Sequence, residues 1–449
     1  MRKTMEKEYE TKLITCPYCF GKFSHNYVHF KATTMKNEMD VRHFQERSRE
    51  SDAQLKKQNE EKIKAFLKTT DSVYREFWSK YPGSENQWEY ADYPVVTPKN
   101  ADQMCVGGYI TDADGMVERI RDIYGNESNI RICPHCHNPL PRGYGRKPVK
   151  FLAVVGITSS GKTVFLAQLL KNIQMYAAKV GIAVHPCSEN EARFVNDFTV
   201  KRGVPLFMGT PTDSLSMPLF YDFQSYTLVI YDVAGENCVR ANQMAKFGPF
   251  ILNSDGIIFL LDPKQFAMIH DEEEDTASPV AVLDAMFNAF VQDVNQVSIP
   301  MAVTFSKSDE LKEKAGEYLH SNSRIFQELQ TKSHRFDEVT HRNIHGELVQ
   351  MMHKMPEGEV LEMSLRRHFS NWAYFAVSAL GCGVELMKKE NPSEKDRFTP
   401  VQNPRPWRLE EPLFWILWKW GVIEAETMQE RDLNPRGAGF LQNLFNRRN

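Results

Sequence analysis

The second part of the chain, from Lys150 onward, alternates short apolar runs with longer segments of helical spacing. The runs are FLAVVG (151–156), YTLVIYDV (226–233), GIIFLLD (256–262), MAVTFS (301–306) and YFAVS (374–378). Strands that alternate with helices predict a mostly parallel sheet with helices on both faces, and therefore an α/β fold. MPLFYDF (217–223) ends just before YTLVIYDV begins, with Gln224 and Ser225 between them, which predicts a hairpin.

The first part of the chain has a different pattern. Lys22 to Tyr81 contains neither proline nor glycine, and from Met35 onward it is dense in Glu, Lys, Gln and Arg. This composition predicts a long helix within an insertion that spans about residues 22–130. Its apolar positions are sparse, so most of its surface is expected to be solvated; a partner-binding arm is the functional alternative.

These patterns divide the chain into three parts. Residues 1–148 form a split module around the insertion, residues 149–423 form the α/β domain, and residues 424–449 form a C-terminal tail. PRPWRLEEPLFWILWKWG (404–421) predicts a closing helix. Its aromatic side chains are expected to belong to the core rather than to a ligand site: Trp407, Phe414, Trp415, Trp418 and Trp420. The tail contains GFLQNLFNRR (439–448), which is either a small docking helix or a frayed terminus.

Four of the eight cysteines form two C-x-x-C pairs, Cys16 with Cys19 and Cys133 with Cys136. Each pair can direct two thiolates at one ion, and two pairs complete a four-sulfur zinc site, so residues 1–148 are expected to be a zinc-ribbon-like module. The alternative is two unrelated thiol pairs. Four thiolates saturate a structural zinc site, so His135 and His137, which flank Cys136, are not expected to bind the metal. The other cysteines lack metal spacing and are expected to be ordinary buried thiols: Cys105, Cys187, Cys238 and Cys382.

Composition and charge narrow the function. The chain has 449 residues, is 42% hydrophobic and 25% charged, and carries a formal net charge of −3. A slightly acidic chain is poorly suited to a large contact with a nucleic-acid backbone. No apolar stretch reaches the length of a membrane span, and the charged N-terminus lacks the pattern of a signal peptide. We therefore expect a cytoplasmic protein without a membrane partner.

GITSSGKT (156–163) stands between an apolar run and a segment of helical spacing. This is the full G-x-x-x-x-G-K-[ST] pattern of a P-loop in its strand-to-helix context. Backbone N–H groups of the loop are expected to surround phosphates, Lys162 to reach the β- and γ-phosphates, and the Thr163 hydroxyl to bind Mg²⁺. A merely structural glycine-rich turn is the alternative. The expected phosphate-loop residues are Gly156, Ser159, Ser160, Gly161, Lys162 and Thr163.

Later strand ends carry further candidate ligands. Asp232 is placed to hold Mg²⁺, and Gly235 allows a backbone N–H to approach the γ-phosphate. Asp309 can accept two hydrogen bonds from the edge of guanine, which adenine does not supply in the same way. Lys307 is expected to lie along the base. The loop SAL is expected to offer its backbone to the guanine oxygen through Ser378, Ala379 and Leu380.

In order and content, GITSSGKT, DVAG, SKSD and SAL resemble the motifs of the Ras-like, translation-factor-related (TRAFAC) clade of P-loop GTPases. The resemblance covers about residues 149–423 and implies a Ras-like GTPase fold that binds GTP or GDP with Mg²⁺. It also implies an effector threonine ahead of residue 217 that closes over Mg²⁺. Thr210 and Thr212 both qualify, and we choose Thr210 from its distance to Asp232. Ser306 stands where the clade usually has Asn or Thr.

The residue after DVAG is a second departure. Many Ras-like members have Gln there to orient the attacking water, whereas this chain has Glu236, which brings negative charge close to the γ-phosphate. We therefore expect slow intrinsic hydrolysis of GTP to GDP and phosphate, stimulated by a partner that supplies an arginine. Arg240 lies close by in the sequence. The expected hydrolytic group is Lys162, Thr210, Gly235 and Glu236.

The four-cysteine module ahead of a GTPase, together with EEPLFWILWKWG, resembles the bacterial double-GTPase families. Those are inferred to act beside a second GTPase in conflict or anti-phage systems, which implies a protein partner. The leading hypothesis is thus a GTP-binding switch read by the zinc module. One alternative is a motor-like or signalling ATPase, which Val233 weakens because a catalytic Glu is expected after Asp232. Others are a non-hydrolysing nucleotide-bound scaffold that binds a partner through the zinc module and insertion, and a nucleic-acid-binding zinc ribbon.

Overall fold

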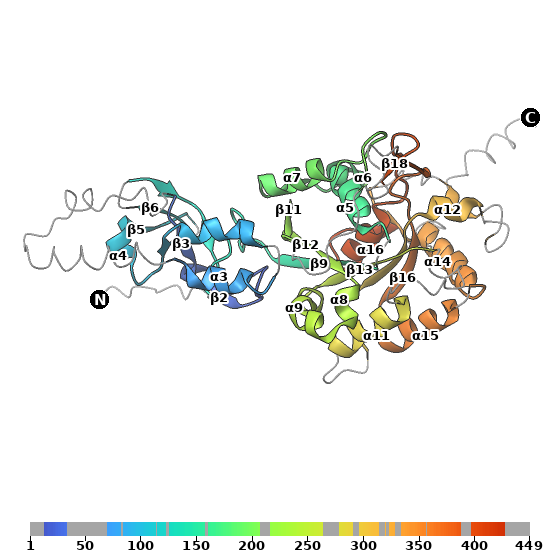
Figure 1. Cartoon of the computed structure of the whole chain (residues 1–449), viewed down its shortest axis with the longest axis horizontal. Coiled ribbons are helices and arrows are strands. Elements are labelled where there is room, and N and C mark those ends of the chain that lie inside the picture. Colours follow the sequence, from blue (N-terminus) through green and yellow to red (C-terminus); the bar gives the residue numbers. More distant parts are fainter. Residues whose placement is uncertain are drawn as a thin grey trace, which may run out of the picture. The chain divides into compact units, whose positions relative to one another are not determined.

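The computed structural model describes most of the chain and divides it into two compact units (Figure 1). The first unit comprises Met1–Lys150, Pro186–Glu189 and Asp213–Val229, and the second comprises Phe151–His185, Asn190–Thr212 and Ile230–Asn449. The described residues are 13–33, 70–81, 84–113, 115–122, 125–157, 160–206, 216–263, 278–290, 296–313, 319, 323–327, 334–355, 357–387 and 397–426.

Short strands build the first unit. β1 (Leu13–Thr15) pairs with β2 (Lys22–Ser24), and β3 (His29–Lys31) lies between β4 (Val95–Val96) and β8 (Arg131–Ile132). A third antiparallel sheet contains β5 (Cys105–Thr111), β6 (Val117–Asp122) and β7 (Glu127–Ser128). The helices are α3 (Ser72–Trp78) and α4 (Ala101–Met104), with 3-10 turns at His25–Tyr27 and Glu85–Asp92.

The insertion is not uniformly helical where it is described. Residues 34–69, which carry most of the predicted long helix, lie outside the described residues, and α3 (Ser72–Trp78) follows them. The β5–β6–β7 sheet was not predicted. Gly107 and Gly108 have positive φ angles of 83° and 70° and shift the register between Cys105 and Tyr109, so the sequence CVGGYIT lacks regular alternation.

A seven-stranded sheet forms the core of the α/β domain, in the order β10-β11-β12-β9-β13-β14-β16. These strands are β9 (Val149–Gly156), β10 (Val184–Pro186), β11 (Leu219–Phe223), β12 (Tyr226–Ala234), β13 (Gly256–Leu261), β14 (Met301–Phe305) and β16 (Trp372–Ala376). β9, β13, β14 and β16 pair in parallel, which confirms the expected mostly parallel sheet. β11 and β12 are neighbours joined by two residues, as expected of a hairpin.

Helices cover both sides of this sheet. Figure 1 shows α5 (Lys162–Lys171) and α6 (Ile173–Lys179) on one side, and α9 (Ala241–Leu252), α11 (Pro279–Phe290) and α15 (Gly358–His368) on the other. Besides α16 (Glu411–Lys419), which closes the domain, the other described helices here are α7 (Glu189–Asp197), α8 (Glu236–Val239), α12 (Ser308–Glu313), a 3-10 turn (Arg324–Phe326) and α14 (Glu338–Met352). No helix in the described part of the chain combines the length and apolar character that crossing a membrane requires.

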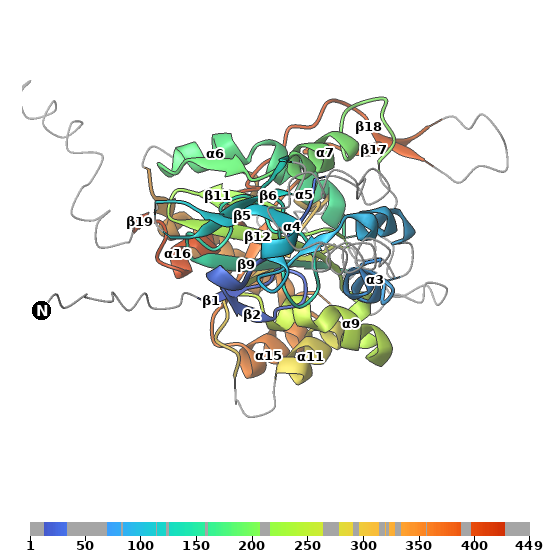
Figure 2. The same ribbon diagram turned by 90° about the vertical axis from the view of Figure 1, so that its left-hand side faces the viewer.

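The predicted closing helix is present as α16 (Glu411–Lys419). Phe414 and Trp415 are 6% and 3% exposed, which confirms the interpretation of these two aromatics as core residues. Trp418 and Trp420 are only half-buried, and Trp407, also half-buried, lies ahead of the helix because the helix begins at Glu411. After α16, β19 (Ala425–Glu426) pairs with β15 (Phe336–Asp337), and residues 427–449 lie outside the described residues. Two further strands, β17 (Val384–Leu386) and β18 (Phe398–Pro400), form an antiparallel ribbon after the loop SAL (Figure 2).

Candidate functional site

The phosphate loop joins β9 to α5. β9 ends at Gly156, and Gly161 caps α5 with a φ of +73°, a left-handed conformation that favours glycine. At Gly156, a Cβ atom would come within 2.6 Å of Ser160 Oγ, so a side chain there would force the loop to shift. The backbone conformation therefore favours glycine at position 161, and the close side chains of Ser160 and Lys162 favour it at position 156.

Lys162 and Asp232 meet at the start of α5. Lys162 Nζ lies 2.6 Å from Asp232 Oδ1, and the two side chains are only 7% and 5% exposed. Ser160 Oγ is buried nearby in the loop and has no hydrogen-bond partner among the described residues. Thr163, the second residue of α5, is half-buried. The structure thus brings the expected lysine and carboxylate together in a site with little water access.

Gly235 packs directly on the phosphate loop. Its N–H donates to the Gly156 carbonyl oxygen at 2.9 Å, and a Cβ at position 235 would lie 3.2 Å from that oxygen. Glu236 begins α8 and is half-buried, whereas Arg240 is exposed. In this structure the Gly235 N–H is therefore hydrogen-bonded to the loop before α5. When a nucleotide is bound, the same N–H is expected to point at the γ-phosphate instead.

Ser306 connects the loop that is expected to hold the base to the loop that is expected to hold the phosphates. It follows β14, and its hydroxyl lies 2.6 Å from the Ser160 carbonyl oxygen and 3.0 Å from that of Leu261. Ser306 is 4% exposed, so these carbonyls satisfy a hydroxyl that water scarcely reaches. Although serine departs from the Asn or Thr of the resembling clade, its hydroxyl still connects the two loops. The next residue, Lys307, has a φ of +52°.

Asp309 lies in the first turn of α12 and is oriented by Ser378. Ser378 Oγ donates to Asp309 Oδ1 at 2.6 Å and accepts from the Gly381 N–H at 2.7 Å. Burial raises the pKa of the Asp309 carboxyl above its ordinary value, although the Ser378 hydrogen bond opposes this shift. A half-buried carboxylate held in one orientation is suited to a ligand edge with two N–H donors.

The segment that returns to α16 braces the loop SAL, which sequence analysis missed. Trp407 exchanges backbone hydrogen bonds with Ser378, and its indole N–H donates to Ser308 Oγ at 3.0 Å. Arg405 N–H donates to the Leu380 carbonyl oxygen at 2.8 Å. The remaining SAL residue, Ala379, is half-buried like Leu380. Trp407 was expected to be a core aromatic, and no local pattern reveals a brace formed by a distant loop.

Three expected residues lie outside the described residues: Ser159 of the phosphate loop, and the effector candidates Thr210 and Thr212. The segment leading to these threonines is described up to residue 206, where Leu206 N–H donates to the Phe398 carbonyl oxygen of β18 at 2.7 Å. The approach to the expected effector region is thus bonded to the β17–β18 ribbon.

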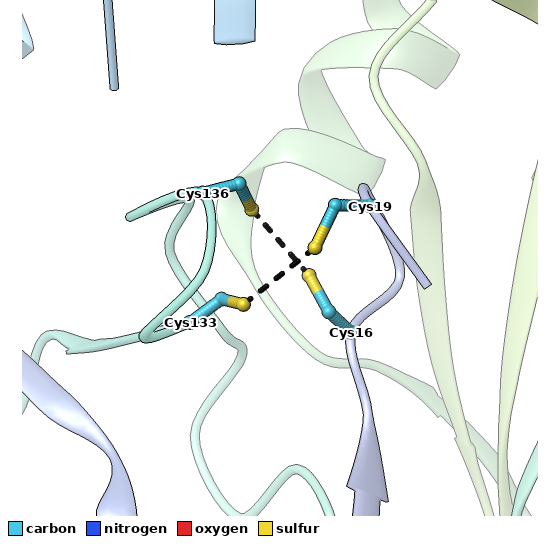
Figure 3. Close-up of side chains that lie close together, drawn as sticks. All are labelled: Cys16, Cys19, Cys133 and Cys136. Carbon is cyan, nitrogen blue, oxygen red and sulfur yellow. Dashed lines mark hydrogen bonds between the residues drawn. The ribbon is translucent and has the colours of Figure 1, made fainter. Parts of the chain in front are cut away.

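The four cysteines of the first unit converge on one point (Figure 3). Cys16 Sγ lies 3.6 Å from Cys136 Sγ, and Cys19 Sγ lies 3.8 Å from Cys133 Sγ. A tetrahedral zinc ion with Zn–S bonds of about 2.3 Å requires sulfur atoms about 3.8 Å apart. The Tyr18 and His135 backbone N–H groups donate to Cys16 Sγ and Cys133 Sγ at 3.4 and 3.3 Å. The donor set and its spacing therefore fit a four-sulfur zinc site.

The two histidines beside Cys136 have other partners. His135 Nε2 lies 3.2 Å from the Lys22 carbonyl oxygen, and His137 Nδ1 lies 2.8 Å from Asp71 Oδ1. Asp71 also contacts Lys31 Nζ at 2.5 Å, and the Lys31 side chain is fully buried. His137 thus belongs to a buried charge network, next to the cysteine cluster in sequence but directed at Asp71.

Comparisons with known proteins give distant similarities, and no protein-family model matches the chain. The "putative ESX-1 scaffolding and assembly protein SaeC" of Mycolicibacterium smegmatis is 22% identical over 324 residues, 66% of this chain and 81% of the relative. A GTP-binding protein from the hyperthermophilic archaeon Sulfolobus solfataricus, in complex with GDP, is 14% identical over 52% of this chain and 47% of that chain, with a TM-score of 0.23. The structure of sup35 complexed with GMPPNP is 8% identical over 52% of this chain and 38% of that chain, with a TM-score of 0.24. The chain spans less than half the length of these solved structures.

Proposed function

We propose that this protein is a guanine-nucleotide-dependent switch that hydrolyses GTP slowly. The observation that carries the proposal is the orientation of Asp309: its half-buried carboxylate is fixed by Ser378, and Ser306 ties the loop before it to the phosphate loop. A carboxylate in this position disfavours a ligand that lacks two N–H donors, because binding such a ligand leaves the half-buried carboxylate without hydrogen-bond partners on that ligand. Guanine has them at one edge, and adenine does not.

The phosphate side supports a switch because its groups have partners that a nucleotide can replace. Lys162 and Asp232 neutralise each other, and Gly235 donates to Gly156. With Mg²⁺·GTP bound, Lys162 would pair with phosphate oxygens, Asp232 and Thr163 would hold Mg²⁺, and the Gly235 amide would turn to the terminal phosphate. Thr210 is our candidate for the effector threonine. Exchange of these contacts would make the loop after Asp232 respond to the nucleotide.

Hydrolysis is proposed to be slow without a partner. Glu236 offers an acceptor for the attacking water but adds negative charge where negative charge already concentrates. Arg240 is exposed, so the stabilising arginine is proposed to come from a partner protein. The role of the four cysteines in this proposal is to hold Zn²⁺ and thereby to fix the module that presents a surface to that partner.

A second candidate is a nucleotide-bound scaffold that does not hydrolyse GTP. The observation that favours it is the curated relative, whose name describes scaffolding and assembly and of which this chain matches 81%. The resemblance to double-GTPase families suggests instead that the partner is a second GTPase in an anti-phage system. Co-purification followed by mass spectrometry of the partner would distinguish these settings.

The decisive test is competition binding with a fluorescent GDP analogue, displaced in turn by GTP, GDP and ATP. Guanine nucleotides should displace it at concentrations at least about 100-fold lower than ATP, because a site built on two hydrogen bonds rejects a ligand without them. Equal displacement by ATP and GTP would overturn the proposal. Single-turnover phosphate release, with and without the co-purified partner, separates a slow switch from a scaffold.

A further inference from the structure

Asp262 lies where the phosphate side and the base side of the site meet. It follows β13, which lies between β9 and β14 in the parallel sheet, so its carboxylate leaves the sheet at the edge that carries both loops. The side chain is 7% exposed, and Asp262 Oδ2 lies 2.7 Å from Lys307 Nζ. Neither the sequence motifs nor the proposed function uses this carboxylate.

Lys307 is held at both of its ends. Its backbone has a φ of +52°, which directs the side chain away from a regular helical or strand path. Near its far end, Cε lies 3.7 Å from where a Cβ of Gly161 would stand, so the stem runs along the phosphate loop. The lysine side chain is 35% exposed, so part of it is open to a ligand.

We propose that Asp262 is a positioning residue for the purine: by holding the Lys307 ammonium, it keeps the lysine stem in place as an apolar wall for the base. The proposal rests on the proposed function, which it deepens. A free lysine side chain loses rotamer entropy when it is fixed. The ion pair with Asp262 fixes it before the nucleotide binds, so the nucleotide does not have to.

Two other roles for Asp262 give different outcomes. If Asp262 held Mg²⁺, its contribution to binding would disappear in EDTA. If the Asp262–Lys307 pair only stabilised the fold, its loss would lower the melting temperature of the protein without changing nucleotide affinity. A positioning role predicts a loss of affinity that is equal with and without Mg²⁺ and that leaves the guanine-to-adenine ratio unchanged, because the stem contacts the face of the base and Asp309 reads its edge.

The test is a double-mutant cycle on the full chain, with dissociation constants for fluorescent GDP and ADP analogues. Asp262→Asn and Lys307→Met should each raise the dissociation constant for GDP about tenfold, and the double variant should lose no more than Lys307→Met alone. Exposed Glu385 of β17 provides the control, since Glu385→Gln makes the same charge change and should bind like the wild type. Melting curves of each variant report its folding.

The outcomes separate the inference from the proposed function. If the wild type binds guanine nucleotides selectively but Asp262→Asn binds GDP equally well, the positioning role is wrong and the proposed function stands. Additive losses in the double variant, or a loss that vanishes in EDTA, also overturn it. If Asp262→Asn fails to fold, Lys307→Met alone decides. Unchanged GDP affinity in that variant would show that the Lys307 side chain does not support the base, so Asp262 would have nothing to position. A wild type that does not prefer guanine overturns the proposed function itself.

Discussion

At the four-cysteine cluster the side chains face a common centre, whereas at the proposed nucleotide site they contact each other. Cys16 and Cys136 approach within 3.6 Å although 120 positions separate them. Lys162 and Asp232 instead form a buried ion pair at 2.6 Å. Donors that converge on one point suit an ion that stays, because the fold satisfies them only through that ion. Groups already paired suit a ligand that comes and goes, because each has a partner in both states.

The largest effect is expected from Cys133→Ser. Binding of a structural zinc is worth about 10–16 kcal/mol in small zinc domains, and much of it is folding energy. The variant should lose its zinc, measured by elemental analysis, and the first unit should become sensitive to limited proteolysis. Cys105→Ser is the matched control, because Cys105 is buried in the same unit but outside the cluster. If the Cys133→Ser protein keeps one zinc ion per chain, the four cysteines do not form the proposed zinc site.

The next largest effect is expected in the buried charge network of the first unit. Asp71 accepts from the Tyr74 N–H as the cap of α3 and contacts Lys31 and His137. Asp71→Asn preserves the cap but leaves the Lys31 charge unpaired, so it should lower the free energy of unfolding by about 3 kcal/mol in urea titrations. Adding Lys31→Met should recover at least half of this loss. An unchanged stability in the single variant would show that the network is dispensable.

The contribution of Asp71 to the stability of the fold should depend on pH in a defined direction. Burial alone would raise the pKa of the Asp71 carboxyl, but the His137 hydrogen bond and the Lys31 charge lower it to about 2, below the ordinary value of 3.8. A carboxyl whose pKa is lower in the folded protein stabilises the fold above the unfolded value. The contribution of Asp71 should therefore be complete above about pH 4 and should be lost as the pH falls towards 2.

On the nucleotide side, Asp309→Asn should reduce selectivity more than it affects folding. The amide offers one acceptor and places an N–H₂ group against guanine donors, so the ratio of ATP to GTP dissociation constants should fall about 100-fold in the competition assay. Glu310→Gln, the neighbouring charge change, should leave the ratio near that of the wild type. If Asp309→Asn keeps the wild-type preference, Asp309 does not read the base.

Local patterns predicted the sheet, and they placed the candidate motifs at its strand ends, because both depend on neighbours in sequence. Apolar runs of strand length gave β9, β13, β14 and β16, and the phosphate loop has a fixed spacing. Asp262 was missed although it ends an apolar run as Asp232 does. The role of a carboxylate after a strand depends on the residue that it contacts, here Lys307, and the sequence does not show that contact. Trp407 was missed for a similar reason: its contact with Ser308 spans 99 positions.

The smallest effect is expected at Ser306, because a single hydroxyl group connects the proposed base side of the site to the proposed phosphate side. Ser306→Ala removes the hydrogen bond to the Ser160 carbonyl, and a net loss of about 1 kcal/mol corresponds to roughly fivefold faster release of a fluorescent GDP analogue. Ser306→Thr keeps the hydroxyl and should differ from the wild type by less than about twofold if the site accepts the methyl group. If alanine releases GDP at the wild-type rate, the two sides of the site are held by the sheet alone. If threonine and alanine are equally fast, packing rather than the hydroxyl sets the rate.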